Sequence, residues 1–393
     1  MKNTFSRTDE SVFGRWWWTI DRWMIAAIIS IIACGAILAL AASPAVAHHK
    51  NLDTFFFARR HFMIIPISVL IMFVVSLLNR RGVKRLATII FGVSIILMIS
   101  TLLTGEEIKG AVRWIKLGGF SIQPSELVKP SFVVISAWMF ANWRLKEDFP
   151  GYLVSVGLYL VVVALLLMQP DVGMSILVSV VWGIQFFLAG LPMLLVLVIG
   201  LIFISGGFLA YFSFSHVQSR IDRFFDPAGS EAYQVARSLE AFRNGGVFGR
   251  GPGEGQVKAV LPDAHADFIF AVAGEEFGLI MTLFVVGLFL FIVLRGFIKA
   301  FKETDLFVQL AIVGLLVQFA LQALINMASA LNLMPTKGMT LPLMSYGGSS
   351  MVASVVGIGM VLALTRERPG QRDILSDLGG KDMGGQLVYG REK

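Results

Sequence analysis

Asp267 stands at the border between a polar loop and a hydrophobic segment. The loop that begins at Gly249 is rich in glycine and polar residues, and the apolar run starts at Phe268. A carboxylate costs much free energy in hydrocarbon and little in a hydrated cavity, so its presence here indicates a functional site. Asp267 could act as a general base, or it could hold a divalent cation such as Mg²⁺ or Mn²⁺ against a phosphate.

Other charged and polar residues lie in nearby predicted loops or in the first turns of helices. Glu126 and Lys129 share a helix face, and Lys129 lies one turn deeper, which favours a cavity-lining pair over a surface pair. On a helical wheel Glu275 lies within a right angle of Asp267, and Glu276 lies opposite it. We therefore expect one glutamate to share a cavity with Asp267. The candidate substrate-binding residues are Arg113, Glu126, Lys129, Arg220, Arg223, His265, Glu275, Lys337 and Ser345.

Several short motifs have both a structural and a functional interpretation. His265 could be a base or a ligand, although a single histidine at a helix entrance is more often a hydrogen-bonding cap. The Gln-Pro-Asp sequence at 169–171 predicts a tight turn with an aspartate cap. The glycine-rich segment 249–255 could hold a phosphate through its amides, but no GKS or GKT sequence follows, which favours a flexible hinge. The small residues of 345–350 allow close helix packing or anion binding at a helix N-terminus.

The elements that must position these residues are membrane helices. With 56% hydrophobic and 15% charged residues and a mean hydropathy of +0.75, the chain is too apolar for a soluble protein of 393 residues. We predict an all-α polytopic membrane protein. Runs long enough to cross about 30 Å of hydrocarbon predict ten helices, near 23–43, 61–78, 86–103, 126–143, 151–168, 172–190, 191–212, 268–294, 305–331 and 343–364.

Basic residues set the expected orientation. They cluster near 80–85, 144–146 and 295–302, on the same side as both termini, which the positive-inside rule makes cytoplasmic. A large loop, 213–266, between the seventh and eighth helices is then extracytoplasmic. This topology accounts for the net charge of +7, and no nucleic acid is invoked.

The chain divides into three parts on this scheme. Residues 1–22 form a cytoplasmic N-terminal segment, and residues 23–365 form the membrane domain. Residues 366–393 form a polar, glycine-rich cytoplasmic tail that we expect to be disordered. Within the large loop, 216–225 and 231–243 are expected to be short helices, the second lying along the membrane surface.

With these residues in place, the chain from Trp23 to Arg366 resembles the SEDS family (shape, elongation, division and sporulation), which are peptidoglycan glycosyltransferases with ten membrane helices. The Pro-Thr-Lys-Gly sequence at 335–338 is similar to that of the division members. Lys109 stands where Asn is common in the family, and Asn332 where Gly usually precedes the Pro, but neither touches the Asp267 motif. The motifs are specific only together: Gly110-Ala111-x-Arg113-Trp114, Gln123-Pro124-Ser125-Glu126, Gln169-Pro170-Asp171, His265-Ala266-Asp267-Phe268, Gly274-Glu275-Glu276 and Ser345 to Ser350.

The resemblance implies a substrate, partners and a location. The substrate would be lipid II, a disaccharide-peptide carried on undecaprenyl diphosphate, polymerised into glycan strands of the septal wall. The implied catalytic residue is Asp267. The implied partners are a class B penicillin-binding transpeptidase, whose membrane helix would dock on this chain, and other membrane proteins of the division machinery. The protein would lie in the bacterial inner membrane at the division site, with its outer loops in the periplasm.

Polymerisation of an α-linked lipid diphosphate into a β-linked glycan requires one displacement with inversion. It needs a base near the acceptor hydroxyl and positive charge near the leaving group. Our hypothesis is that Asp267 deprotonates the acceptor 4-hydroxyl. The cations that could steady the diphosphate are Arg113, Lys129, Arg220, Arg223 and Lys337.

Two other functions compete with polymerisation. A transporter that flips lipid II would also need a cavity with ionisable residues, although transporters commonly place these residues near the midplane and show inverted repeats. A non-enzymatic division scaffold would explain the tail but would leave the clustered charged residues unexplained. Glycan synthesis by purified protein in detergent would distinguish an enzyme from both.

Overall fold

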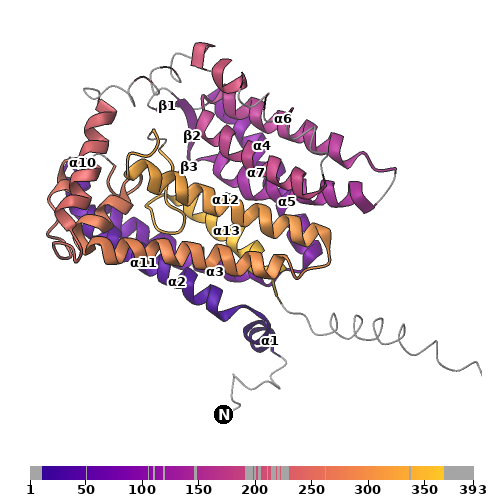
Figure 1. Cartoon of the computed structure of the whole chain (residues 1–393), viewed down its shortest axis with the longest axis horizontal. Helices are drawn as coiled ribbons and strands as arrows, with labels where there is room; N and C mark the ends of the chain where they lie inside the picture. Colours follow the sequence, from indigo (N-terminus) through magenta and orange to yellow (C-terminus); the bar gives the residue numbers. More distant parts are fainter. Residues whose placement is uncertain are drawn as a thin grey trace, which may run out of the picture.

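The computed structural model describes most of the chain between Ser11 and Arg366 (Figure 1). The described parts are 11–49, 51–104, 106–108, 111–117, 120–145, 148–190, 230–261, 263–335 and 338–366, with isolated positions between 198 and 222. The described residues do not include the tail from 367. They include only a minority of the predicted helix at 191–212 and of the predicted short helix at 216–225. The count of ten helices therefore stays a prediction.

Six described helices are long and apolar enough to cross a membrane: α2 (Arg22–His49), α3 (Phe56–Ser76), α4 (Arg80–Thr104), α6 (Gly151–Met168), α11 (Ile269–Ala300) and α12 (Leu306–Ala330). Two shorter apolar helices, α7 (Val172–Leu188) and α13 (Gly348–Leu364), accompany them. Each lies where the hydropathy predicted a helix. Hydropathy succeeds because a membrane helix satisfies all its backbone hydrogen bonds within itself.

The core forms around a helix that carries charged residues. Helix α5 (Pro124–Leu145) is buried along most of its length, and it packs against α4, α6, α7, α12 and α13. Helix α11 packs against α2, α12 and α10 (Ser230–Gly245), and α10 lies at the end of the bundle far from α1 (Val12–Thr19) (Figure 1). The predicted surface helix at 231–243 thus corresponds to α10.

The expectation of an all-α chain is wrong in one loop. Between α4 and α5 the chain forms three short antiparallel strands, β1 (Glu106–Ile108), β2 (Ala111–Leu117) and β3 (Phe120–Ile122), in the order β1-β2-β3. Strand β2 pairs with β3 in the register Ile115 to Ile122 and Leu117 to Phe120. The β-branched and aromatic residues of β2 favour extended backbone, and hydropathy does not reveal such short strands outside the membrane.

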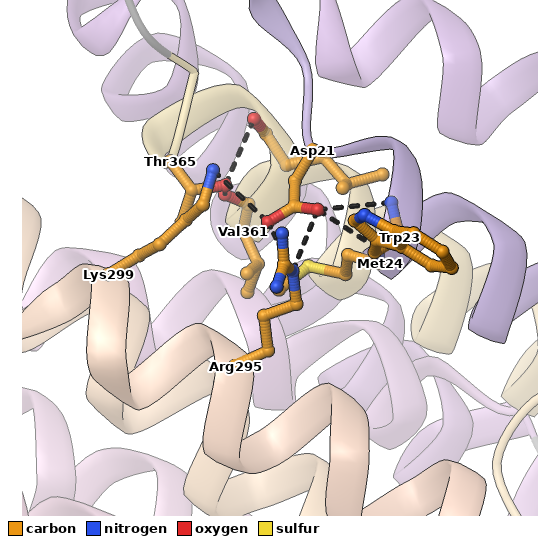
Figure 2. Close-up of polar contacts among 8 residues, drawn as sticks. Asp21, Trp23, Met24, Arg295, Lys299, Val361 and Thr365 are labelled. Atoms are coloured by element: carbon orange, nitrogen blue, oxygen red, sulfur yellow. Dashed lines mark hydrogen bonds and ion pairs between the residues drawn. The ribbon is translucent and has the colours of Figure 1, made fainter.

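A buried carboxylate holds the N-terminal helix to the rest of the bundle at the end opposite α10. Asp21, between α1 and α2, has a side chain that is 1% exposed and pairs with Arg295 at 2.7 Å and Lys299 at 3.1 Å, both from α11 (Figure 2). Its Oδ1 also accepts the amides of Trp23 and Met24, at 3.1 and 3.2 Å. The cluster therefore ties the turn between α1 and α2 to α11, because both carboxylate oxygens of Asp21 have partners there.

The Asp21 cluster predicts a specific pH dependence. Burial raises the pKa of Asp21, but the Arg295 hydrogen bond, the Met24 amide and the Lys299 charge outweigh it and leave the pKa below the usual 3.8. The contribution to stability is therefore complete above about pH 4 and is lost as the pH falls through the lowered folded pKa.

Thermal unfolding of wild type and Asp21→Asn in detergent tests this expectation. The variant should melt at a lower temperature at pH 7, and the difference should shrink as the pH falls below about 4. A gap between the two melting temperatures that stays constant over that range would contradict the assignment.

Candidate active site

Asp267 lies in the turn that leads into α11, at the end of the bundle where α10 lies. Its amide donates to the carbonyl of Asp263 at 3.0 Å, and its own carbonyl accepts from Nδ2 of Asn326 at 2.8 Å. The side chain is partly exposed, and its Oδ2 lies beside Gly338, where a Cβ would approach to 3.6 Å. The backbone of Asp267 is thus held from both sides, while its carboxylate faces the loop that precedes α13.

Two amide side chains of α12, Asn326 and Gln322, lie between the Asp267 turn and the interior of the bundle. Asn326 also donates to the carbonyl of Met339 at 2.6 Å. One turn earlier in α12, Gln322 donates to the carbonyl of Thr340 at 3.2 Å and accepts from Lys129 Nζ at 2.9 Å. Neither amide was singled out from the sequence. Two amide side chains four residues apart in an apolar helix are the signal that could have found them.

Glu126 and Lys129 form a buried ion pair. Lys129 Nζ lies 2.9 Å from Glu126 Oε2, and the two side chains are 2% and 9% exposed. The alternative of a snorkelling surface pair is therefore wrong. The pair lies in the core between α5 and α12, where Gln322 satisfies part of the ammonium. An ion pair with this little solvent depends on both partners being present.

Helix α11 is broken near its start, and this break positions the Asp267 turn. Gly278 has φ 72° and ψ −166°, which no helix contains. The loop after α10 takes up the backbone groups that the break releases: Leu279 N donates to Gly246 O at 2.9 Å, and Gly251 N donates to Glu276 O at 2.9 Å. A Cβ at Gly278 would collide with the backbone of this loop. The segment Ile269–Phe277 is therefore a short helix fastened to the loop.

Both glutamates of this short helix face the loop. Glu275 is fully buried, and its carboxylate accepts the amides of Gln256, Val257 and Lys258 at 2.8 to 3.3 Å. Glu276 forms an ion pair with Lys258, whose Nζ also donates to Gly253 O at 2.8 Å. The Glu275 carboxylate is thus occupied by amides of the loop, so the geometry supports a positioning role. Lys258 was not among the residues singled out from the sequence.

Substituting Glu275 by Gln is expected to loosen the loop. The side-chain NH₂ of the new glutamine would face backbone N–H groups, which are also donors, so at least one buried N–H would lose its acceptor. Each such unsatisfied group lowers the stability of the loop by about 1–3 kcal/mol. Amides 256–258 should exchange with deuterium about tenfold faster or more. Hydrogen exchange measured by mass spectrometry is the test, and Glu254→Gln, an exposed glutamate of the same loop, is the matched control. Equal exchange in both variants would remove Glu275 from this role.

Arg113 is bound to the turn between α6 and α7. Its Nε donates to the carbonyl of Gln169 at 3.1 Å and its Nη2 to that of Pro170 at 2.6 Å. Its Nη1 pairs with Asp171 at 3.2 Å, and Asp171 Oδ1 accepts the amide of Met174 at 3.3 Å. The predicted tight turn with an aspartate cap is confirmed. Arg113 connects β2 to this turn, so its contact with a diphosphate stays a prediction.

His265 and Ser345 support the loop before α13. The His265 ring packs against Phe57 of α3 and Tyr346, with ring centres 4.4 and 5.1 Å apart. The His265 carbonyl accepts the Tyr346 amide at 3.0 Å, and Ser345 Oγ accepts the amide of Leu341 at 2.8 Å. Both side chains are buried. Their direct contact with a substrate stays a prediction.

Three of the predicted substrate-binding residues lie outside the described parts of the chain: Arg220, Arg223 and Lys337. Of the others, Glu126 and Lys129 contact Gln322, and Asp267 contacts Asn326. Both amides donate to the adjacent carbonyls of Met339 and Thr340. Arg113, Glu275, His265 and Ser345 hold the loops around them.

Residues 21–369 match the model of a family described as "Cell cycle protein", named for FtsW, RodA and SpoVE. A protein of Caulobacter vibrioides named "Probable peptidoglycan glycosyltransferase FtsW" is 45% identical over 94% of this chain and 95% of its own length. A protein of the same name from Trichlorobacter lovleyi is 31% identical over 88% of this chain and 93% of its own length.

Solved structures are also similar. A structure described as "Structural coordination of polymerization and crosslinking by a peptidoglycan synthase complex" has a TM-score of 0.73 at 28% identity, covering 88% of this chain and 97% of that chain. The rod shape determining protein RodA of Thermus thermophilus has a TM-score of 0.64 at 27% identity, covering 89% and 97%. The family expected from the motifs is confirmed, and the chain belongs to the FtsW, RodA and SpoVE family of cell cycle proteins.

Proposed function

We propose that this protein is a peptidoglycan glycosyltransferase that polymerises lipid II during cell division. The observation that supports this most directly is the Asp267 turn: a partly exposed carboxylate whose backbone is fixed by Asn326 beside a glycine loop at Gly338. A carboxylate that is partly exposed on a fixed backbone suits general-base catalysis, because the base must reach the hydroxyl proton in a set position. The sequences of relatives named as peptidoglycan glycosyltransferases align with this chain over 94% and 88% of its length.

In the proposed reaction, the acceptor 4-hydroxyl attacks the anomeric carbon of the donor sugar. The new bond is the glycosidic C–O bond, and the bond that breaks joins the same carbon to the diphosphate, which leaves with its undecaprenyl chain. Asp267 accepts the hydroxyl proton. Arg220, Arg223 and Lys337 supply the positive charge for the leaving group, whereas Lys129 is neutralised by Glu126 in the core.

A divalent cation at Asp267 would need oxygen ligands from the substrate. The described residues contain no group of three His, Cys, Asp or Glu side chains that could hold a metal, and Glu275 and Glu276 are engaged by the loop. Mg²⁺ commonly binds through one or two carboxylates together with phosphates and water. Asp267 fits that pattern as one ligand.

The orientation that fits this function places the Asp267 turn outside the cytoplasm. Arg80, which pairs with Asp305, and Arg295, which pairs with Asp21, lie at the opposite end of the bundle. Their concentration there supports a cytoplasmic location for that end and for both termini. We further propose that a class B penicillin-binding transpeptidase docks on the membrane helices, with other division proteins, in the bacterial inner membrane at the septum.

The experiment that tests the function is synthesis of glycan from lipid II by the purified chain in detergent, alone and with its co-purified transpeptidase. We expect strands longer than the disaccharide, resolved by gel electrophoresis after labelling. Detergent contains no bilayer to cross, so a lipid II flippase would give no product. A scaffold would also give none, and absence of product with the partner present would overturn the proposal.

A further inference from the structure

An apolar groove opens on the bundle surface at the end where α1 lies. It has a volume of ≈ 500 Å³ and runs between α1, α2, α3 and the end of α13. Its walls include Ile25, Ile29, Val69, Leu70, Phe73 and Leu362. This volume is in the range of roughly 300–1,000 Å³ typical of sites for small molecules.

The groove faces the hydrocarbon of the membrane. Ile29 and Leu70 are 52% and 61% exposed, and both belong to helices that are long and apolar enough to span. Apolar side chains exposed on the outer face of spanning helices contact acyl chains. Its shape is held from within the protein, because Trp16 Nε1 donates to Ser76 Oγ at 2.8 Å and fixes α1 against the end of α3.

The groove itself is apolar, but polar groups lie behind its wall at the end nearest α1. Trp16 and Ser76 line this end. Arg366 donates to Thr19 Oγ1 at 2.9 Å and to the carbonyl of Ser76 at 3.4 Å, which brings a guanidinium to this end. An aromatic ring, a hydroxyl and a cation at the end of an apolar channel are the groups expected where lipid headgroups begin.

A second cation, Arg22, lies on α2 one turn before the lining residue Ile25. Arg22 precedes Ile25 and Ile29 by three and seven residues on α2, so all three lie on one helix face, and Arg22 is exposed. Its guanidinium lies over the Trp18 ring at 4.5 Å. Helix α1 contains no acidic residue, and the nearby Asp21 is buried beneath Arg295 and Lys299 (Figure 2). The mouth therefore attracts anions.

We propose that this groove binds one acyl chain of an anionic glycerophospholipid from the leaflet that surrounds α1, with its phosphate at Arg22. The walls select hydrocarbon, and the cations at the mouth select the charge of the headgroup. Basic pockets between membrane helices bind anionic headgroups in this way. Helix α1, which borders the groove, lies far from α10 and from the start of α11 (Figure 1), so the site is separate from the proposed reaction and does not depend on it.

Native mass spectrometry of the full chain tests the site. The protein is reconstituted with equal amounts of phosphatidylglycerol and phosphatidylcholine and is then released from detergent in the spectrometer. We expect one retained phosphatidylglycerol per wild-type chain. Leu70→Trp, which fills the groove, should lower retention about tenfold, and Arg22→Gln should lower the preference for phosphatidylglycerol about fivefold, the value of one cation near a headgroup.

Matched controls carry the same changes elsewhere. Ile96→Trp is the control for Leu70→Trp, because Ile96 on α4 is apolar and is 67% exposed against 61% for Leu70. Arg85→Gln is the control for Arg22→Gln, because it removes another exposed cation from the same end of the bundle. Both should retain phosphatidylglycerol like wild type. Thermal unfolding identifies any variant that fails to fold, and Val69→Trp then replaces Leu70→Trp. Any of three results would overturn the proposal. These are equal retention of the two lipids by the wild type, unchanged retention in both tryptophan variants, and retention of a polypeptide in place of lipid.

Discussion

Replacing Asp267 by Asn is expected to abolish most glycan synthesis. Asn has the same size and can keep the backbone contact with Asn326, but it cannot accept the hydroxyl proton or hold a cation. General bases contribute about 10²–10⁴-fold to rate, so we expect a fall of at least about a hundredfold in the initial rate of lipid II polymerisation. The measurement uses the chain co-purified with its transpeptidase.

The control for this variant is Asp53→Asn. Asp53 is an exposed carboxylate on the loop between α2 and α3, paired with Arg59, and the two side chains are 60% and 66% exposed. Its removal should leave the rate unchanged. Full activity of Asp267→Asn would exclude both the base and the cation-holding role. A rate that returns in Asp267→Glu when Mn²⁺ replaces Mg²⁺ would favour the cation.

Replacing Lys129 by Met is expected to destabilise the fold strongly. The change leaves Glu126 as a charge without a counter-ion in the core, and removing one partner of a buried pair costs about 3–5 kcal/mol. The Gln322 contact is lost as well. Unfolding followed by temperature or denaturant in detergent should show a large loss, and activity should fall with the folded fraction.

A double variant separates charge from packing. Glu126→Gln combined with Lys129→Met removes the uncompensated charge, so most of the lost stability should return, because a buried pair replaced as a unit is often close to neutral. Arg237→Met breaks an exposed pair with Glu240 on α10, with side chains 37% and 44% exposed, and should change little. If the double variant is no more stable than Lys129→Met, the loss arises from packing and not from the buried charge.

Much of the site could be located from the sequence, but the contacts of its residues could not. The spacing of Glu126 and Lys129 predicted a shared helix face, and their ion pair confirms it. The wheel position of Glu275 predicted a neighbour of Asp267, whereas its carboxylate binds the amides of Gln256 and Val257. A helical wheel assumes an unbroken helix within one element, and it cannot include a loop that folds back from earlier in the chain.

The sequence by itself determined the eight apolar helices that the structure describes, because hydrophobic length and internal backbone hydrogen bonding are properties of each segment alone. It also determined the family, through short motifs in loops. The tertiary structure decided the break at Gly278, the burial of Lys129 against Gln322 and the groove between α1 and α3. Each of these depends on atoms from segments far apart in the chain, whose approach is set by packing of the whole bundle and not by any local pattern.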